Sequence, residues 1–165
     1  MGRLIERADK TSRLVDVKYF ILLPSASAVG NTLDLAQWSA MLRSASALEM
    51  YRRFRGRIAP TPVVDFLLLD RDFPRSLRHC VSGAERSLHA ITGTPAGSFG
   101  NNAEQELGRL RADLEFTSID DIIGRGMHEF IDDFQTRLNA AGERIYTCFF
   151  AAAIERPAQH QEFTQ

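Results

Sequence analysis

Clustered arginines are the feature of this chain with the clearest capacity for chemistry. Four guanidinium groups fall within six residues, at Arg52, Arg53, Arg55 and Arg57. Such a cluster can bind phosphate groups or nucleic acid, but it can equally complement the dipole at the carboxyl end of a helix. Because the net charge is −1 and Phe54 is the single interleaved aromatic residue, we do not expect nucleic acid as a partner.

Charged residues near the start of the chain form a second group with helical spacing. They are Arg3, Glu6, Lys10 and Arg13, separated by three or four positions. Side chains with this spacing share one face of a helix, where exposed ion pairs contribute about 0.3–0.5 kcal/mol each. On spacing alone, the group is interpreted as a solvent-exposed ladder of ion pairs.

The histidines and cysteines do not complete a site. His128 and Asp132 share a helix face, as in a zinc-binding H-E-x-x-H helix, but Asp132 replaces the second histidine. His79 and Cys80 are adjacent on a predicted helix, so their side chains point about 100° apart and cannot act together as base and nucleophile. The sequence therefore predicts no metal, no cofactor and no specific enzyme active site.

Composition indicates one soluble globular domain. The 165 residues are 44% hydrophobic and 25% charged, which is ordinary for such proteins. We expect no contact with membranes, because no run approaches the roughly 20 apolar residues of a membrane span and charges interrupt the first residues before a signal-peptide core could form. Cys80 and Cys148 are predicted to be buried, reduced thiols of a cytoplasmic protein.

The elements that must position these side chains are predicted to be helices. Residues 63–69 could form a buried strand, but no partner strand is evident, so a short buried helix is preferred. Apolar spacing of three and four residues places the other helices at about 1–23, 31–56, 72–93 and from 101 or 102 onward. A sequence at 118–121 that resembles a capping box leads, through Gly124 and Gly126, into the longest helix, which continues to about 148. The resulting fold class is all-α: an antiparallel bundle of five to six helices with one long C-terminal helix.

Domain boundaries follow from where this spacing begins and ends. The helical domain is expected to span residues 1–153, and residues 154–165 are expected to be a disordered tail. No N-cap residue precedes the first apolar pattern. We therefore expect the chain to be a piece of a longer domain, cut inside a helix.

Four segments of this chain resemble one protein family in one order. Residues 2–19, which contain the pair Glu6-Arg7, closely resemble the signature helix of the bacterial Alpha-E domain family. Residues 44–53, 66–76 and 127–133 resemble further segments of that family. The resemblance implies an all-helical fold and a Glu-Arg motif at Glu6-Arg7. Because family members are usually about twice this long, it also implies that the chain corresponds to the C-terminal half.

The resemblance implies two functions, since genes of this family typically lie beside a circularly permuted ATP-grasp ligase and a transglutaminase-like peptidase. One is a non-catalytic helical partner of the ligase or its peptide substrate. The other is an enzyme or substrate-binding subunit of the same peptide or amide-ligation pathway. Its pocket for an anionic substrate would be lined by Glu6, Arg7, Arg13, Arg52, Arg53 and Arg75.

Two further expectations concern the Glu-Arg pair and assembly. If Glu6 and Arg7 form a buried ion pair, they are a structural strut rather than a binding site. Faces that pack on another half in longer relatives should leave an apolar patch here. A second copy could bury that patch, so a two-fold homodimer is expected.

Overall fold

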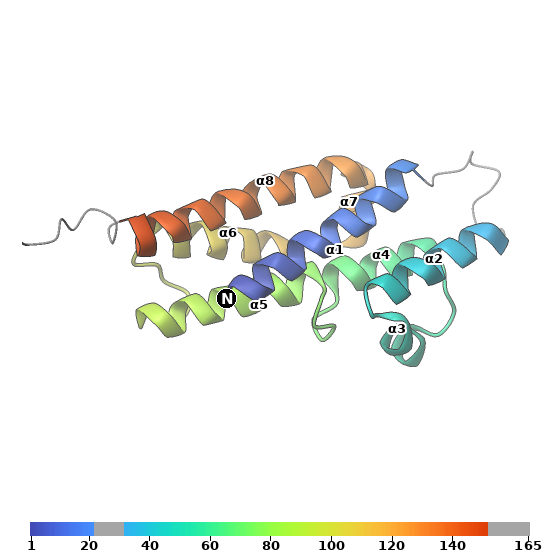
Figure 1. The fold of residues 1–165 in the computed structure, drawn as a ribbon, viewed down its shortest axis with the longest axis horizontal. Helices are drawn as coiled ribbons and strands as arrows, with labels where there is room; N and C mark the ends of the chain where they lie inside the picture. Colours follow the sequence, from blue (N-terminus) through green and yellow to red (C-terminus); the bar gives the residue numbers. More distant parts are fainter. Residues whose placement is uncertain (22–31, 152–165) are drawn as a thin grey trace, which may run out of the picture.

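The computed structural model describes residues 1–21 and 32–151, and within these it contains helices and no strand (Figure 1). The all-α prediction is thereby confirmed. The helices are α1 (Gly2–Ile21), α2 (Thr32–Ser44), α3 (Leu48–Arg55), α4 (Pro60–Leu69), α5 (Leu77–Thr92), α6 (Asn102–Phe116), α7 (Ile119–Arg125) and α8 (Met127–Tyr146). A π-helical segment, η2 (Thr147–Ala151), continues α8.

The helices of the described residues outnumber the five or six that were predicted, because two predicted helices are divided. The helix expected over residues 31–56 breaks at Ser46, whose φ of 53° lies in the left-handed region. Gly126 separates α7 from α8 with a φ of 101°, a conformation that glycine adopts without strain. The short buried helix expected at residues 63–69 is present as α4. The expected tail lies outside the described residues.

Helix α1 occupies the centre of the bundle. It packs against α5 on one side and α8 on the other, and it also contacts α2 and α4 (Figure 1). The side chains that it buries recur every three or four residues, as expected for a helix with one face in the core. They are Ala8, Thr11, Ser12, Val15 and Lys18.

Helices α1 and α5 approach each other closely at a glycine. A Cβ atom built on Gly83 of α5 would lie 3.0 Å from Cδ1 of Leu4, closer than carbon atoms pack in protein interiors. The missing side chain at Gly83 therefore lets the two helices come together. This approach brings the first turns of α1 alongside the first half of α5.

The apolar residues that recur every three or four positions in the predicted helices are largely buried. The apolar faces expected in α2, α6 and α8 are buried, including Trp38, Leu107 and Leu138. Ile91 is an exception at 61% exposure, because α5 extends about 12 Å from Gly83 to Ile91, beyond the first turn of α1. Cys148 is also exposed, contrary to the prediction, because the π-helical segment changes the residue spacing per turn.

A buried ion pair fixes the end of α1 to the start of α2. Lys18 Nζ lies 3.0 Å from Asp34 Oδ1, and each residue is 4% exposed. Lys18 also donates to Oε1 of Gln37 at 2.7 Å and lies 5.0 Å from the centre of the Trp38 ring. Removing one partner of such a pair typically destabilises a protein by about 3–5 kcal/mol.

Polar contacts connect α1 to α8 on its other side. His128 Nδ1 lies 2.8 Å from Oδ1 of Asp16, and Gln135 Nε2 donates to Oγ of Ser12 at 3.1 Å. The hydrogen bond with Asp16 raises the pKa of His128 above its ordinary value, although partial burial opposes it. His128 is therefore a structural contact of α1 in this fold.

We expect Gly83→Val to lower the free energy of unfolding by about 1–3 kcal/mol, because the added atoms overpack the α1–α5 contact. The matched control is Gly142→Val in α8, where a Cβ would meet nothing within 4 Å. Chemical denaturation measures both. Equal effects of the two substitutions would show that the close approach at Gly83 does not matter.

The His128–Asp16 contact predicts a pH dependence of stability. Because the folded-state pKa of His128 is raised, its contribution is fully present below the unfolded pKa and is lost as the pH rises through the folded pKa. Thermal melts from pH 6 upward should therefore show the wild type losing stability that a His128→Gln variant does not lose. Parallel curves for the two proteins would contradict this.

Candidate functional site

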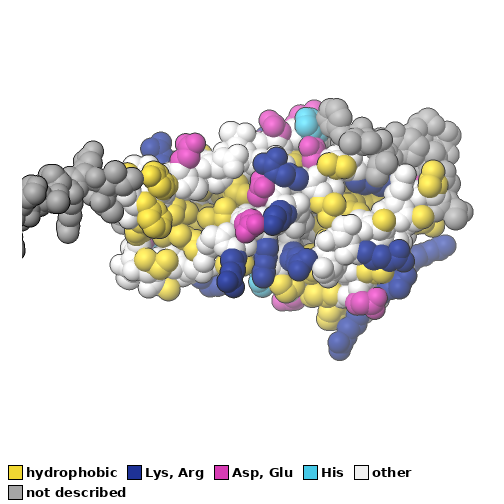
Figure 2. Space-filling view, viewed as in Figure 1, with side chains coloured by type: hydrophobic (Ala, Val, Ile, Leu, Met, Phe, Trp, Pro, Cys, Tyr) yellow, Lys and Arg dark blue, Asp and Glu magenta, His cyan; other side chains and the backbone are white. Residues whose placement is uncertain are grey.

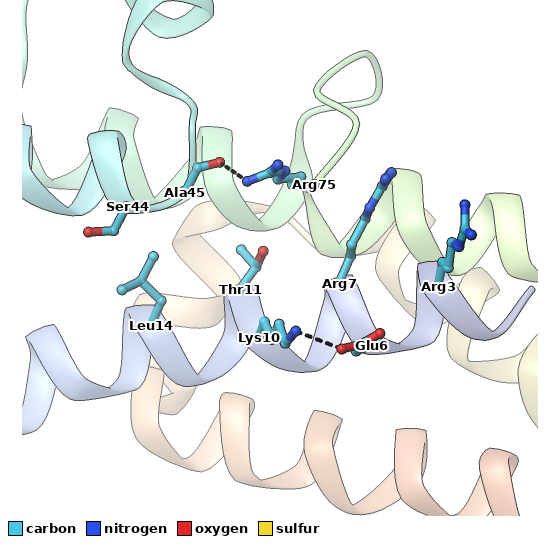
Figure 3. Close-up of a pocket in the computed structure, with 9 residues that line it drawn as sticks. All are labelled: Arg3, Glu6, Arg7, Lys10, Thr11, Leu14, Ser44, Ala45 and Arg75. Carbon is cyan, nitrogen blue, oxygen red and sulfur yellow. Dashed lines mark hydrogen bonds and ion pairs between the residues drawn. The ribbon is translucent and has the colours of Figure 1, made fainter.

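A cleft of about 440 Å³ opens beside α1 (Figure 3). Helix α1 contributes six lining residues, the end of α2 contributes two, and the loop before α5 contributes one. They are Arg3, Glu6, Arg7, Lys10, Thr11 and Leu14, then Ser44 and Ala45, and finally Arg75. The six residues of α1 project from less than half of the helix circumference, so they form one continuous wall of the cleft.

The loop between α4 and α5 holds Arg75 in place. Oδ1 of Asp70 accepts hydrogen bonds from the backbone N–H groups of Asp72 and Phe73 at 3.0 and 2.9 Å. Ser76 caps α5 by accepting from the N–H of His79 at 3.0 Å. The helix therefore begins at Leu77 rather than at residues 72–74 as predicted, since the chain first completes the turn around Asp70.

Arg75 reaches across the cleft to the end of α2. It donates to the carbonyl oxygen of Ala45 at 3.2 Å and to Oγ of Ser46 at 2.9 Å. Both acceptors are neutral, so the charge of the guanidinium is not balanced by these contacts. The left-handed turn at Ser46 thus presents acceptors that fix a cation at the edge of the cleft.

Positive charge exceeds negative charge in the cleft. Four of the lining residues are cationic and Glu6 alone is anionic. Nζ of Lys10 donates to Oε1 of Glu6 at 2.6 Å, and this hydrogen bond, with the charge of Lys10, lowers the pKa of Glu6. Glu6 therefore stays ionised and balances Lys10.

The three arginines of the cleft have no carboxylate partner in the part of the chain that the structure describes. Figure 3 shows Arg3 and Arg7 extending from α1 toward the side of the cleft on which Arg75 lies. Lysine and arginine side chains also gather near the middle of this face of the molecule in Figure 2. A guanidinium binds carboxylate or phosphate through paired hydrogen bonds, so this arrangement suits an anionic ligand.

Half of the predicted site residues meet in this cleft: Glu6, Arg7 and Arg75. Arg13 does not line it, because its Nε donates to Oδ2 of Asp9, four residues earlier on the same helix, at 2.9 Å. Arg13 is exposed and Asp9 is half-buried.

The structure does not bring Arg52 and Arg53 into this cleft. Both side chains are exposed on α3. The physical reason is the break at Ser46, which ends α2 and redirects the chain into α3. Arg53 instead lies over the ring of Phe54, with Cζ 5.7 Å from the ring centre.

Sequence reasoning did not include Arg3 and Lys10 among the binding residues. Arg3, Arg7 and Lys10 recur at intervals of four and three residues, which places them on one helix face. That spacing could have identified the basic wall. The contribution of Ser44 could not have been found in this way, because it depends on how α2 packs.

Adjacent Glu-Arg pairs occur three times in the described residues, and the contacts around the three pairs differ. Besides Glu6-Arg7, they are Glu85-Arg86 in α5 and Glu143-Arg144 in α8. Glu85 is occupied by an ion pair with Nε of Arg111 at 2.9 Å. Of the three pairs, Glu6-Arg7 is the one that lines the 440 Å³ cleft with both residues.

Two other observations concern ligands and membranes. Across residues 1–21 and 32–151, no three His, Cys, Asp or Glu side chains come together as a possible metal site. In the same residues, no helix combines the length and the apolar character needed to cross a membrane.

A buried thiol lies near the arginines of the cleft. Cys80 of α5 is fully buried, and its Sγ donates to the carbonyl oxygen of Pro74 at 3.5 Å. Burial raises the pKa of Cys80 to about 11, although the positive charges of Arg7 and Arg75 act in the opposite direction. The thiol is therefore protonated at neutral pH and is not a nucleophile.

Comparison with known proteins gives one match. The model of the Alpha-E family, described as "A predicted alpha-helical domain with a conserved ER motif", matches residues 1–150. No curated protein and no solved structure matches the chain.

The two cysteines should differ sharply in reactivity. At pH 8, about one in a thousand molecules would carry a Cys80 thiolate, and the side chain is fully buried, whereas Cys148 is exposed. We expect a disulfide reagent to label one thiol per chain rapidly and the second only after unfolding. A Cys148→Ser variant should lose the rapid phase, and a rapid phase that persists would contradict the burial of Cys80.

Proposed function

Since the chain belongs to the Alpha-E family, whose description names a fold and a motif but no activity, we propose that it is a helical anion-binding protein. Its ligand carries a carboxylate or phosphate group, which enters the cleft beside Glu6-Arg7. One observation carries this proposal: three guanidinium groups without carboxylate partners among the described residues line a single cleft.

The chemistry of the cleft favours binding over catalysis. Its polar groups are guanidinium, ammonium, hydroxyl and one carboxylate that is held by Lys10. The nearest thiol, Cys80, is buried and protonated. Such a set can hold and orient an anion, but it offers no activated nucleophile.

We place this binding activity in the pathway that the family resemblance implies. The anionic ligand would be a substrate of a circularly permuted ATP-grasp ligase, and a transglutaminase-like peptidase would act in the same peptide or amide-ligation pathway. The chain would serve as the substrate-binding subunit. ATP-dependent ligation would place that pathway in the cytoplasm.

A second candidate is a scaffold that binds these enzymes or a second copy of itself. Exposed aromatic rings on the last turns support it: Tyr146, Phe149 and Phe150 are 53%, 37% and 56% exposed. Exposed apolar surface of this kind is common where proteins associate. Co-purification with each of the two enzymes, together with light scattering of the isolated chain, would test the candidate.

The proposed anion site predicts a specific pattern of binding defects. Arg7→Gln and Arg75→Gln should each weaken the binding of orthophosphate or succinate about tenfold or more, because each removes a charge-assisted hydrogen bond. Arg7→Lys should also weaken it, since an ammonium cannot reproduce a paired contact. Nuclear magnetic resonance titration measures these affinities.

The matched control is Arg13→Gln, which removes an exposed arginine of the same helix outside the cleft. It should bind like the wild type. Melting temperatures should stay nearly unchanged in the Arg7 and Arg13 variants, because these exposed side chains contribute little to stability. Equal losses from Arg13→Gln and Arg7→Gln would mean that the anion responds to general charge and not to this cleft.

A further inference from the structure

A second basic hollow lies on α5, outside the site described above. Its volume is about 240 Å³, and its lining includes His79, Ser82 and Arg86. These residues step by three and four along α5, so they lie on one side of that helix. Arg75 lies two residues before Leu77, and Arg71, which lines the hollow, lies in the same loop, so the cleft and the hollow both adjoin the start of α5.

Two of the other cations in this hollow already have structural partners. Arg71 pairs with Glu115. Arg78 donates through Nε to the carbonyl oxygen of Leu114 at 2.9 Å and thereby caps the end of α6. Arg86, in contrast, has no ion pair in the described part of the chain.

Arg86 folds over the contact between α1 and α5. Its Nη2 lies 3.7 Å from the position that a Cβ of Gly83 would occupy, and Cδ1 of Leu4 lies 3.0 Å from the same position. Its guanidinium is thus within about 7 Å of Leu4, the neighbour of Arg3. Arg86 thereby stands between the hollow on α5 and the arginines of α1.

The arginines of the cleft and the hollow are arranged in order along the line of contact between α1 and α5. Leu4 of α1 faces Gly83 of α5. The two helices run in opposite directions (Figure 1), so Arg7, one turn later in α1, lies near Cys80, one turn earlier in α5. Arg75 and Arg7 lie toward one end of this line, and Arg3 and Arg86 lie toward the other.

We propose that the cleft and the hollow form one extended site and that its ligand is an oligophosphate, a chain of at least two linked phosphate groups. This inference rests on the proposed anion-binding function and specifies its ligand. Arg3 and Arg7 are one helical turn apart, about 6 Å along α1, so their guanidinium groups can bind different phosphate groups of one chain. Arg86 binds the group farthest from Arg75.

A phosphate chain suits these residues better than an acidic peptide does. It concentrates several charges and many acceptor oxygens in a short length, and every guanidinium can make paired contacts with it. An acidic peptide must order a flexible side chain for each carboxylate, which costs conformational entropy. Hydroxyl groups at Thr11 and Ser82 supply further donors.

The residues that line the cleft and the hollow also indicate that the protein recognises the phosphate groups of its ligand and not an attached nucleoside. Apart from the imidazole of His79, no aromatic ring lines either the cleft or the hollow among the described residues. A nucleoside base would therefore find no stacking surface of the usual kind. Inorganic tripolyphosphate and a nucleoside triphosphate should bind with similar affinity.

Calorimetric titration of the full chain with orthophosphate, tripolyphosphate and ATP, at about 0.15 M salt, tests the inference. Tripolyphosphate should bind at least about tenfold tighter than orthophosphate, and ATP should bind within about threefold of tripolyphosphate. Arg86→Gln should weaken tripolyphosphate about tenfold and orthophosphate less than about twofold. Arg144→Gln, which removes an exposed arginine of α8, should change neither.

The outcomes separate this inference from the function on which it rests. If orthophosphate binds as tightly as tripolyphosphate, or if Arg86→Gln changes nothing, the extended site is wrong while the anion cleft stands. Tighter binding of a pentaglutamate peptide than of tripolyphosphate would also overturn the inference. If no anion binds, or if Arg7→Gln has no effect on any of them, the anion-binding function itself is wrong.

Discussion

The close approach of α1 and α5 at Gly83 is the constraint on which the rest of this structure depends. A helix without a side chain at that point can come within contact distance of Leu4. This position of α1 in turn determines where its other faces lie. One face packs on α8 through the contacts of Ser12 and Asp16, and the basic face is left beside the loop that carries Arg75.

The charges in the cleft destabilise the protein when no ligand is bound. Unpaired like charges repel one another, and a fold selected for stability alone would place carboxylates among them. Carboxylates are abundant elsewhere, since Arg55 contacts both Asp65 and Asp70, at 3.1 and 3.4 Å. The absence of such partners around Arg3, Arg7 and Arg75 in the described residues is therefore a property of this cleft. A bound anion would relieve the repulsion.

The sequence predicts those parts of the fold that depend on local spacing. The apolar positions of α6 and α8 repeat by three and four, and burial follows that repeat as far as Ile145. The break at Ser46 was not predictable, because the surrounding Ser-Ala-Ser-Ala segment has neither glycine nor proline. The site was predicted only in part, because it also depends on more than local spacing. Arg7 and Arg75 were identified individually, but their meeting depends on packing between residues far apart in the chain.

The Glu-Arg pair itself can be understood from helix geometry. Adjacent residues on a helix point about 100° apart, so Glu6 and Arg7 cannot share a contact and are not a buried strut; both are exposed. Glu6 turns along the helix to Lys10, four residues later, while Arg7 faces α5 and the charge of Arg75. The carboxylate thus balances the cation on its own side of α1, and the guanidinium stays available. Adjacency in the sequence is what separates these two roles in space.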